Sequence, residues 1–165
     1  TSVILSQFSW CRFCSGSQYN VLTMPGVTLR LATAANAYEI AVMSRYLIEI
    51  GLRGWSWHPE RVVRAIRARD TNVLVTEFEG HLVGFAIMEF GDTKAHLSLF
   101  AVKPAHQRCG IGRQMMEWLE DTALAAGISI VNLELRTNNF AGCSFYHVRV
   151  SCAPGLLTPV WRQTP

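Results

Sequence analysis

Residues 107–112 read Gln107-Arg-Cys-Gly-Ile-Gly112, and they lie between a predicted strand that ends near Val102 and a predicted amphipathic helix. A helix N-terminus carries unpaired N–H groups and the positive end of the helix dipole. Glycines let an anion approach this backbone without a Cβ in the way. Arg108 and Arg113 add positive charge. The stretch therefore predicts a site for a phosphate group.

The spacing of the glycines excludes two other phosphate-binding motifs. A P-loop requires G-x-x-x-x-G-K-[ST], which the sequence does not contain, and a dinucleotide fingerprint requires a third glycine where Met115 stands. The two glycines by themselves are equally compatible with an ordinary turn between a strand and a helix.

Hydrophobic periodicity predicts a mixed order of strands and helices around this stretch. We expect strands at 27–31, 72–78, 82–90, 95–102 and 130–135, the second and third forming an antiparallel hairpin. Helices are expected at 35–52, from Pro59, at 112–126 and at 139–147. In the first helix, apolar residues recur at helical spacing: Ile40, Met43, Leu47 and Ile50. This order indicates a mixed α/β sheet.

Composition limits the class of protein. Half of the 165 residues are hydrophobic, and 15 basic against 12 acidic residues give a net charge of +3. Such a chain is typical of one folded domain, and its mild charge does not indicate a nucleic-acid partner. No apolar run reaches the roughly 18 residues that cross a bilayer, and the first twenty residues lack a signal-peptide pattern. We therefore expect a cytoplasmic protein without a membrane partner.

Five cysteines without regular spacing favour reduced thiols. Cys11 and Cys14 form a lone C-x-x-C, which is the pattern of half a zinc site or of a redox pair. No second pair follows at zinc-finger spacing. We therefore expect no metal site.

A second motif follows the glycine turn. It reads Leu133-Glu-Leu-Arg-x-x-Asn139 and then Phe145-Tyr146. Together with Val-x-Pro and Gln-x-x-Gly-x-Gly, it resembles the GNAT acetyltransferase family over about residues 26–147, with the spacing of the RimI-like ribosomal-protein alanine N-acetyltransferases. The resemblance implies the GNAT fold, an α/β (α+β) architecture with a mixed, mostly antiparallel sheet flanked by helices.

The resemblance also implies acetyl-CoA as cosubstrate, with no metal. The pyrophosphate would bind the loop backbone, and the pantetheine and acetyl group would bind main-chain groups at the end of the preceding strand, with Asn139 touching the pantetheine arm. The residues so implied are Phe100, Ala101 and Val102 on the strand and Gln107, Arg108, Cys109, Gly110, Ile111, Gly112 and Arg113 in the loop.

Transfer to an amine needs a base, because an amine is protonated at neutral pH. The resemblance implies that Glu134 is this base and that Tyr146 is the acid that protonates the departing thiolate. The residues alone leave two alternatives open: a salt bridge between Glu134 and Arg136, and a tyrosine buried in the core.

The end of the chain departs from the family. Family members normally continue as Tyr-x-x-x-Gly-Phe and add two strands, whereas here Tyr146 is followed by His-Val-Arg-Val150. We expect a poorly ordered leader at 1–23, a GNAT acetyltransferase domain at 24–150 and an atypical tail at 151–165, with the C-terminal strands missing. The sheet edge so exposed would favour a homodimer.

The resemblance implies direct transfer of an acetyl group from acetyl-CoA to a primary amine. The RimI-like spacing favours the N-terminal α-amine of a protein or peptide as acceptor. Two alternatives stay open: a small-molecule amine, such as a polyamine or an antibiotic, and a non-catalytic GNAT module that binds acetyl-CoA.

Overall fold

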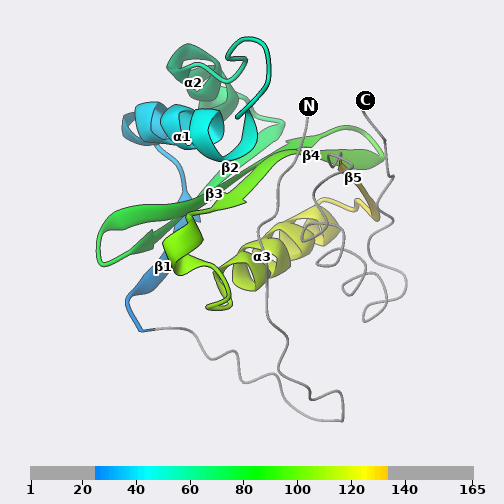
Figure 1. Ribbon diagram of the computed structural model, residues 1–165. Helices are drawn as coiled ribbons and strands as arrows, with labels where there is room; N and C mark the ends of the chain where they lie inside the picture. The colour runs from blue at the N-terminus through cyan, green and yellow to red at the C-terminus, as the bar shows by residue number, and fades with distance from the viewer. Residues whose placement is uncertain (1–24, 134–165) are drawn as a thin grey trace.

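The computed structural model describes residues 25–133 of the chain. Within this range, five strands form one sheet in the order in which they follow along the chain (Figure 1). Neighbouring strands are antiparallel except for the last pair, which is parallel. The strands are β1 (Val27–Leu31), β2 (Thr71–Phe78), β3 (His81–Phe90), β4 (Lys94–Val102) and β5 (Ile130–Leu133). The predicted mixed, mostly antiparallel sheet is confirmed.

The predicted hairpin is formed by β2 and β3. Its turn consists of Glu79 and Gly80, whose φ angles are 51° and 79°. Two-residue hairpin turns with positive φ at both positions match the right-handed twist of the strands that they join. Glycine adopts this conformation without strain, and His81 already belongs to β3.

Helices cover both faces of the sheet (Figure 1). On one face lie α1 (Ala37–Met43) and α2 (Pro59–Arg67), which enclose a core that includes Val73, Ile87 and Leu99. On the other face lies α3 (Ile111–Ala125), which packs on Leu74, Phe100 and their neighbours. Alternate residues of each central strand therefore enter two different cores, which is why these strands are apolar on both faces.

The first helix is shorter than predicted. After α1 the chain continues as a π-helical turn, Ser44–Ile48, in which the amide of Glu49 donates to the carbonyl of Ser44 at 2.8 Å. A π-helical turn contains one more residue than an α-helical turn, so it rotates the side chains that follow it around the helix axis. Consequently Ile48 is buried, whereas Ile50 is 62% exposed. The position of Ile50 in the apolar spacing was therefore misleading.

Gly84 on β3 allows α3 to lie close to the sheet. A Cβ at this position would stand 3.0 Å from Sδ of Met115 and 3.2 Å from the carbonyl oxygen of Ala101. Both distances are shorter than ordinary van der Waals contact, so a side chain here would force the side chain of Met115 and the backbone at Ala101 to shift by a few tenths of an ångström. The helix that follows the glycine turn is thereby held against β3 and β4.

Several expectations lie outside the described residues. These are the leader at 1–23 with Cys11 and Cys14, the end of the strand predicted at 130–135, the helix at 139–147 and the tail at 151–165. Within the described range, none of the helices is long and apolar enough to cross a membrane.

Candidate cofactor-binding loop and active site

The loop between β4 and α3 is fixed to the end of β4 by its own side chains. The amide Nε2 of Gln107 donates to the main-chain carbonyl of Val102 at 2.9 Å. The thiol of Cys109 donates in turn to the carbonyl of Gln107 at 3.4 Å. Gln107 therefore holds the loop in place by bonding back to the strand.

Two residues of this loop have left-handed backbone conformations. The φ angles of Arg108 and Gly110 are 65° and 83°, whereas Cys109 between them does not have a positive φ. Chain segments that change handedness in this way can direct successive N–H groups into one concavity, which suits an anion. Gly110 is the N-cap of α3, and no atom of the described residues lies within 4 Å of the place where its Cβ would stand. A ligand can therefore reach the backbone there.

The amides at the start of α3 are available to an anion. Among the described residues, no hydrogen bond uses a main-chain N–H between Arg108 and Arg113, and the first bond of the helix runs from Gln114 to Gly110 at 3.1 Å. The first turn of α3 carries no acidic residue. Arg113 is about half exposed and lies 3.8 Å from Glu117. These N–H groups, the helix dipole and the arginine charge fit a pyrophosphate.

The pairing of β4 with its neighbouring strands changes near Ser98. Opposite β3, Ile87 pairs with Leu99 but Met88 pairs with Leu97, so Ser98 is the extra residue of a β-bulge. The described β4–β5 pairing ends one residue earlier, at Leu97 and Leu133. The predicted pantetheine-binding residues, Phe100 to Val102, thus lie beyond the bulge, and their side chains are buried in the two cores. A ligand can meet these residues only through their main chain.

Glu134, Asn139 and Tyr146 lie outside the described residues, so their roles stay predictions. The structure does bring the cofactor-binding residues predicted on β4 and in the loop together, at one end of β4.

The sequence did not reveal the role of Glu49, which is 3% exposed. Its carboxylate accepts hydrogen bonds from Oγ of Ser44 at 2.9 Å, from N and Oγ of Ser56 at 2.6 and 2.9 Å, and from N of Trp57 at 3.2 Å. Burial raises the pKa of this carboxyl. The four hydrogen bonds together lower the pKa by more than burial raises it, so the net shift is downward. Glu49 thereby fixes the loop between α1 and α2.

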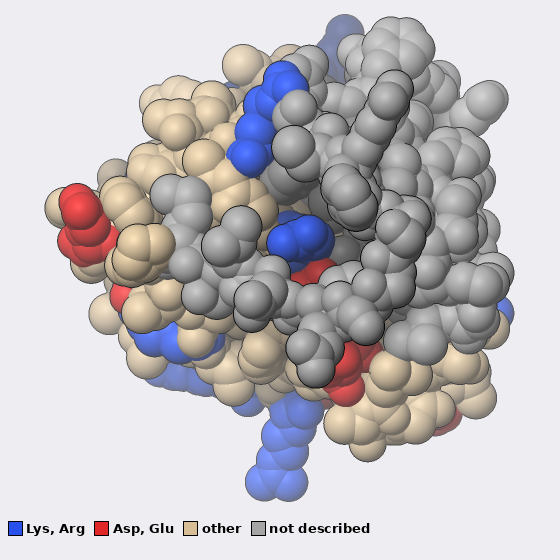
Figure 2. Space-filling model, turned by 90° about the horizontal axis from the view of Figure 1, so that it is seen from below, with Lys and Arg blue, Asp and Glu red and all other residues tan. Residues whose placement is uncertain are grey.

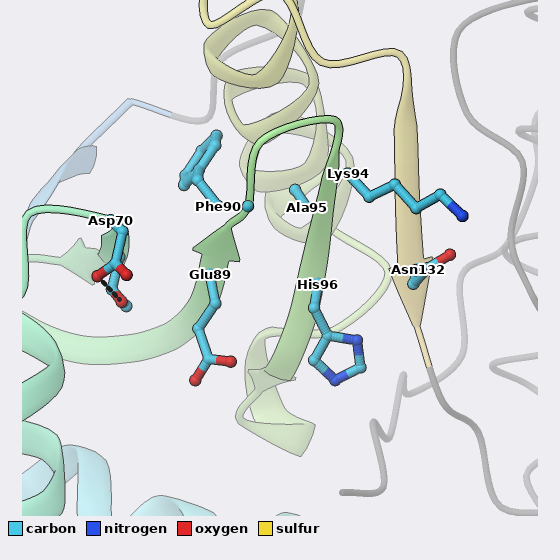
Figure 3. A pocket seen from close by; sticks show the side chains of 9 residues that line it. Asp70, Glu89, Phe90, Lys94, Ala95, His96 and Asn132 are labelled. Atoms are coloured by element: carbon cyan, nitrogen blue, oxygen red, sulfur yellow. Dashed lines mark hydrogen bonds between the residues drawn. The ribbon is translucent and has the colours of Figure 1, made fainter.

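The sequence also did not reveal a row of polar side chains that crosses three neighbouring strands. Glu89, His96 and Asn132 are paired across β3, β4 and β5 and therefore share a face of the sheet. Figure 3 shows Glu89 and His96 extending in the same direction from neighbouring strands. They line a cleft of about 510 Å³ together with Asp70, Thr71, Phe90, Gly91, Lys94 and Ala95. Only the strand register, which the sequence does not state, brings these residues together.

The charges of the described residues form no patch of one sign on the face shown in Figure 2, where basic and acidic side chains are interspersed. Within the same residues, no group of three or more His, Cys, Asp or Glu side chains is placed to hold a metal ion.

Residues 36–149 match the model of the acetyltransferase (GNAT) family. The chain belongs to the GNAT acetyltransferase family. It is 31% identical, over 101 residues, to the [ribosomal protein bS18]-alanine N-acetyltransferase of Escherichia coli K12, covering 61% of this chain and 68% of that protein. The chain is therefore an N-acetyltransferase of the GNAT type, as the resemblance implied.

Solved structures of GNAT proteins share the fold. The PaiA N-acetyltransferase of Thermoplasma acidophilum, solved with coenzyme A, superimposes with a TM-score of 0.66 at 20% identity, over 74% of this chain and 87% of that one. A ribosomal-protein-alanine N-acetyltransferase of Brucella melitensis gives a TM-score of 0.62 at 21% identity, over 74% and 89% of the two chains. At these identities the likeness concerns the GNAT fold alone.

Proposed function

We propose that this GNAT enzyme transfers the acetyl group of acetyl-CoA to the N-terminal α-amine of a protein or peptide. The binding of acetyl-CoA is supported by one observation in particular. The main-chain N–H groups of the loop from Arg108 to Arg113 meet no acceptor among the described residues. The coenzyme A complex of the PaiA protein supports the same cofactor.

The choice of a protein α-amine as acceptor rests on the relative from Escherichia coli, whose name specifies an alanine of a ribosomal protein. The relative favours a polypeptide amine over a polyamine or an antibiotic. We propose as well that the catalytic domain spans residues 24–150, the range that holds both motifs.

In this proposal the residues have separate tasks. Gln107 keeps the loop on β4, and Gly110 leaves the backbone open to the pyrophosphate. Main-chain groups of Phe100 to Val102 and the side chain of Asn139 position the pantetheine. Glu134 removes a proton from the attacking amine, directly or through water, and Tyr146 gives a proton to the departing thiolate.

The test is release of the coenzyme A thiol from acetyl-CoA in the presence of N-terminal peptides, polyamines and aminoglycosides. The proposal expects release with peptides, and a loss of about 100-fold or more in Glu134→Gln and Tyr146→Phe, because each removes a proton-transfer group. Release only with polyamines or aminoglycosides contradicts the peptide acceptor. Saturable binding of acetyl-CoA without release, for any acceptor, indicates a non-catalytic module instead.

A further inference from the structure

Strand β4 separates two approaches to the reaction centre. Its C-terminal end continues through Val102 into the phosphate-binding loop, so the cofactor of the proposed function occupies the half of β4 beyond the Ser98 bulge. The half of β4 that starts at Lys94 is then left for the acceptor polypeptide. The polar cleft lies at that start.

The cleft is within reach of the first residues of a polypeptide. His96 lies two residues before Ser98, which in a strand is about 7 Å. An extended peptide advances about 3.3 to 3.6 Å per residue. If its α-amine lies beside the bulge, its second or third side chain lies beside the row of Glu89, His96 and Asn132.

The cleft offers acceptors of hydrogen bonds that lack donors. Glu89 is exposed, and among the described residues no salt bridge or hydrogen bond engages its carboxylate. Oδ1 of Asn132 also lacks a partner in the same part of the chain, but it is buried, so Glu89 offers the accessible acceptors. Lys94, also at the cleft, extends across β5 and away from Glu89 (Figure 3).

The other acidic group of the cleft is the carboxylate of Asp70. Oδ1 of Asp70 accepts a weak bond from the hydroxyl of Thr71 at 3.4 Å. Glu89 has no such partner among the described residues and extends beside His96 (Figure 3), so its carboxylate is placed to receive a ligand. An exposed carboxylate without a donor suits a cationic group with several N–H donors.

We propose that Glu89 binds a lysine or arginine side chain at the second or third position of the acceptor polypeptide. The proposal rests on the proposed function, because it requires a peptide acceptor. Glu89 is then a residue that determines specificity, and the chemical step does not involve it.

The test uses alanine-initiated peptides that are identical except for arginine, glutamine or glutamate at positions 2 and 3. Steady-state acetylation is measured for the unaltered protein, Glu89→Gln, Glu89→Lys and the control Asp121→Asn. Asp121 is exposed on α3, on the opposite face of the sheet. Binding of the same peptides to the protein saturated with coenzyme A supplies a readout independent of turnover.

We expect the unaltered protein to prefer the arginine peptide over the glutamine peptide by about fivefold in kcat/KM, the size of a partly exposed ion pair. The difference should lie in KM, because the contact is the same before and during the reaction. Glu89→Gln should abolish the preference, Glu89→Lys should favour the glutamate peptide, and Asp121→Asn should change neither.

Two outcomes separate this inference from the proposed function. Equal use of all three peptides, or an unchanged preference in Glu89→Gln, overturns the role of Glu89 while the enzyme remains a peptide acetyltransferase. Absence of acetylation of every peptide overturns the proposed acceptor, and the role of Glu89 with it.

Discussion

The side-chain amide of Gln107 donates a hydrogen bond of 2.9 Å to the main-chain carbonyl of Val102. Val102 is the last residue of β4, and Gln107 precedes the left-handed residues of the loop. This bond joins the strand that is proposed to meet the pantetheine to the loop that is proposed to meet the pyrophosphate.

Gln107→Glu should weaken acetyl-CoA binding, because a carboxylate of the same size cannot donate to Val102. A net hydrogen bond contributes about 1 kcal/mol, so the Kd for acetyl-CoA should rise about fivefold in titration calorimetry. If Gln107→Glu leaves the Kd for acetyl-CoA unchanged, the loop keeps its conformation without this bond.

Gly110→Ala and Gly127→Ala form a matched pair. Both glycines have positive φ, 83° and 76°, and at both positions a Cβ would meet no atom of residues 25–133 within 4 Å. Each substitution should therefore lower the free energy of unfolding by about 1 to 2 kcal/mol through backbone strain. Only Gly110→Ala should also weaken acetyl-CoA binding, because Gly127 lies at the other end of α3. Equal affinity of the two variants contradicts a ligand at Gly110.

Glu49→Gln should remove part of the acid dependence of stability. The folded pKa of Glu49 lies below its ordinary value of 4.5, so its contribution is complete above that pH and is lost as the pH falls through the folded value. We expect the substitution to cost about 1 to 3 kcal/mol at neutral pH and less in acid, in denaturant titrations. Glu60→Gln, at an exposed position of α2, is the control. A cost that is the same at every pH contradicts the charged role of Glu49.

Gly84→Ala should destabilise the contact between α3 and the sheet by about 1 to 3 kcal/mol. Met115→Ala removes the sulfur that the new Cβ would meet at 3.0 Å, so the two substitutions should be less than additive in thermal unfolding. If the two losses of stability are strictly additive, the sulfur of Met115 does not contribute to the cost of Gly84→Ala. The carbonyl of Ala101 then accounts for the whole effect.

Much of the fold could be predicted from local pattern. The apolar strand segments, Pro59 at the start of α2 and the hairpin of β2 and β3 each depend on residues close in sequence, and each was predicted correctly, although the connection between the two strands is one residue shorter than the predicted 79–81. The glycine loop was likewise predicted to lie at a helix N-terminus, which Gly110 at the N-cap of α3 confirms.

Local pattern failed where a single backbone irregularity changes the register. The π turn before Glu49 moves Ile50 to the surface, and the bulge at Ser98 shifts the pairing of β4. Neither irregularity has a composition signal, because each depends on how the segment fits its neighbours.

The sequence alone determined the order of the elements within residues 25–133, the glycine turn at a helix N-terminus and the resemblance to the GNAT family, since these depend on residue type and spacing along the chain. Tertiary structure decided which distant residues meet. Glu49 holds Ser56 and Trp57, Gln107 holds Val102, and Glu89 joins His96 and Asn132 at one cleft. Such contacts depend on strand register and helix packing, which are set by the whole sheet rather than by any one segment.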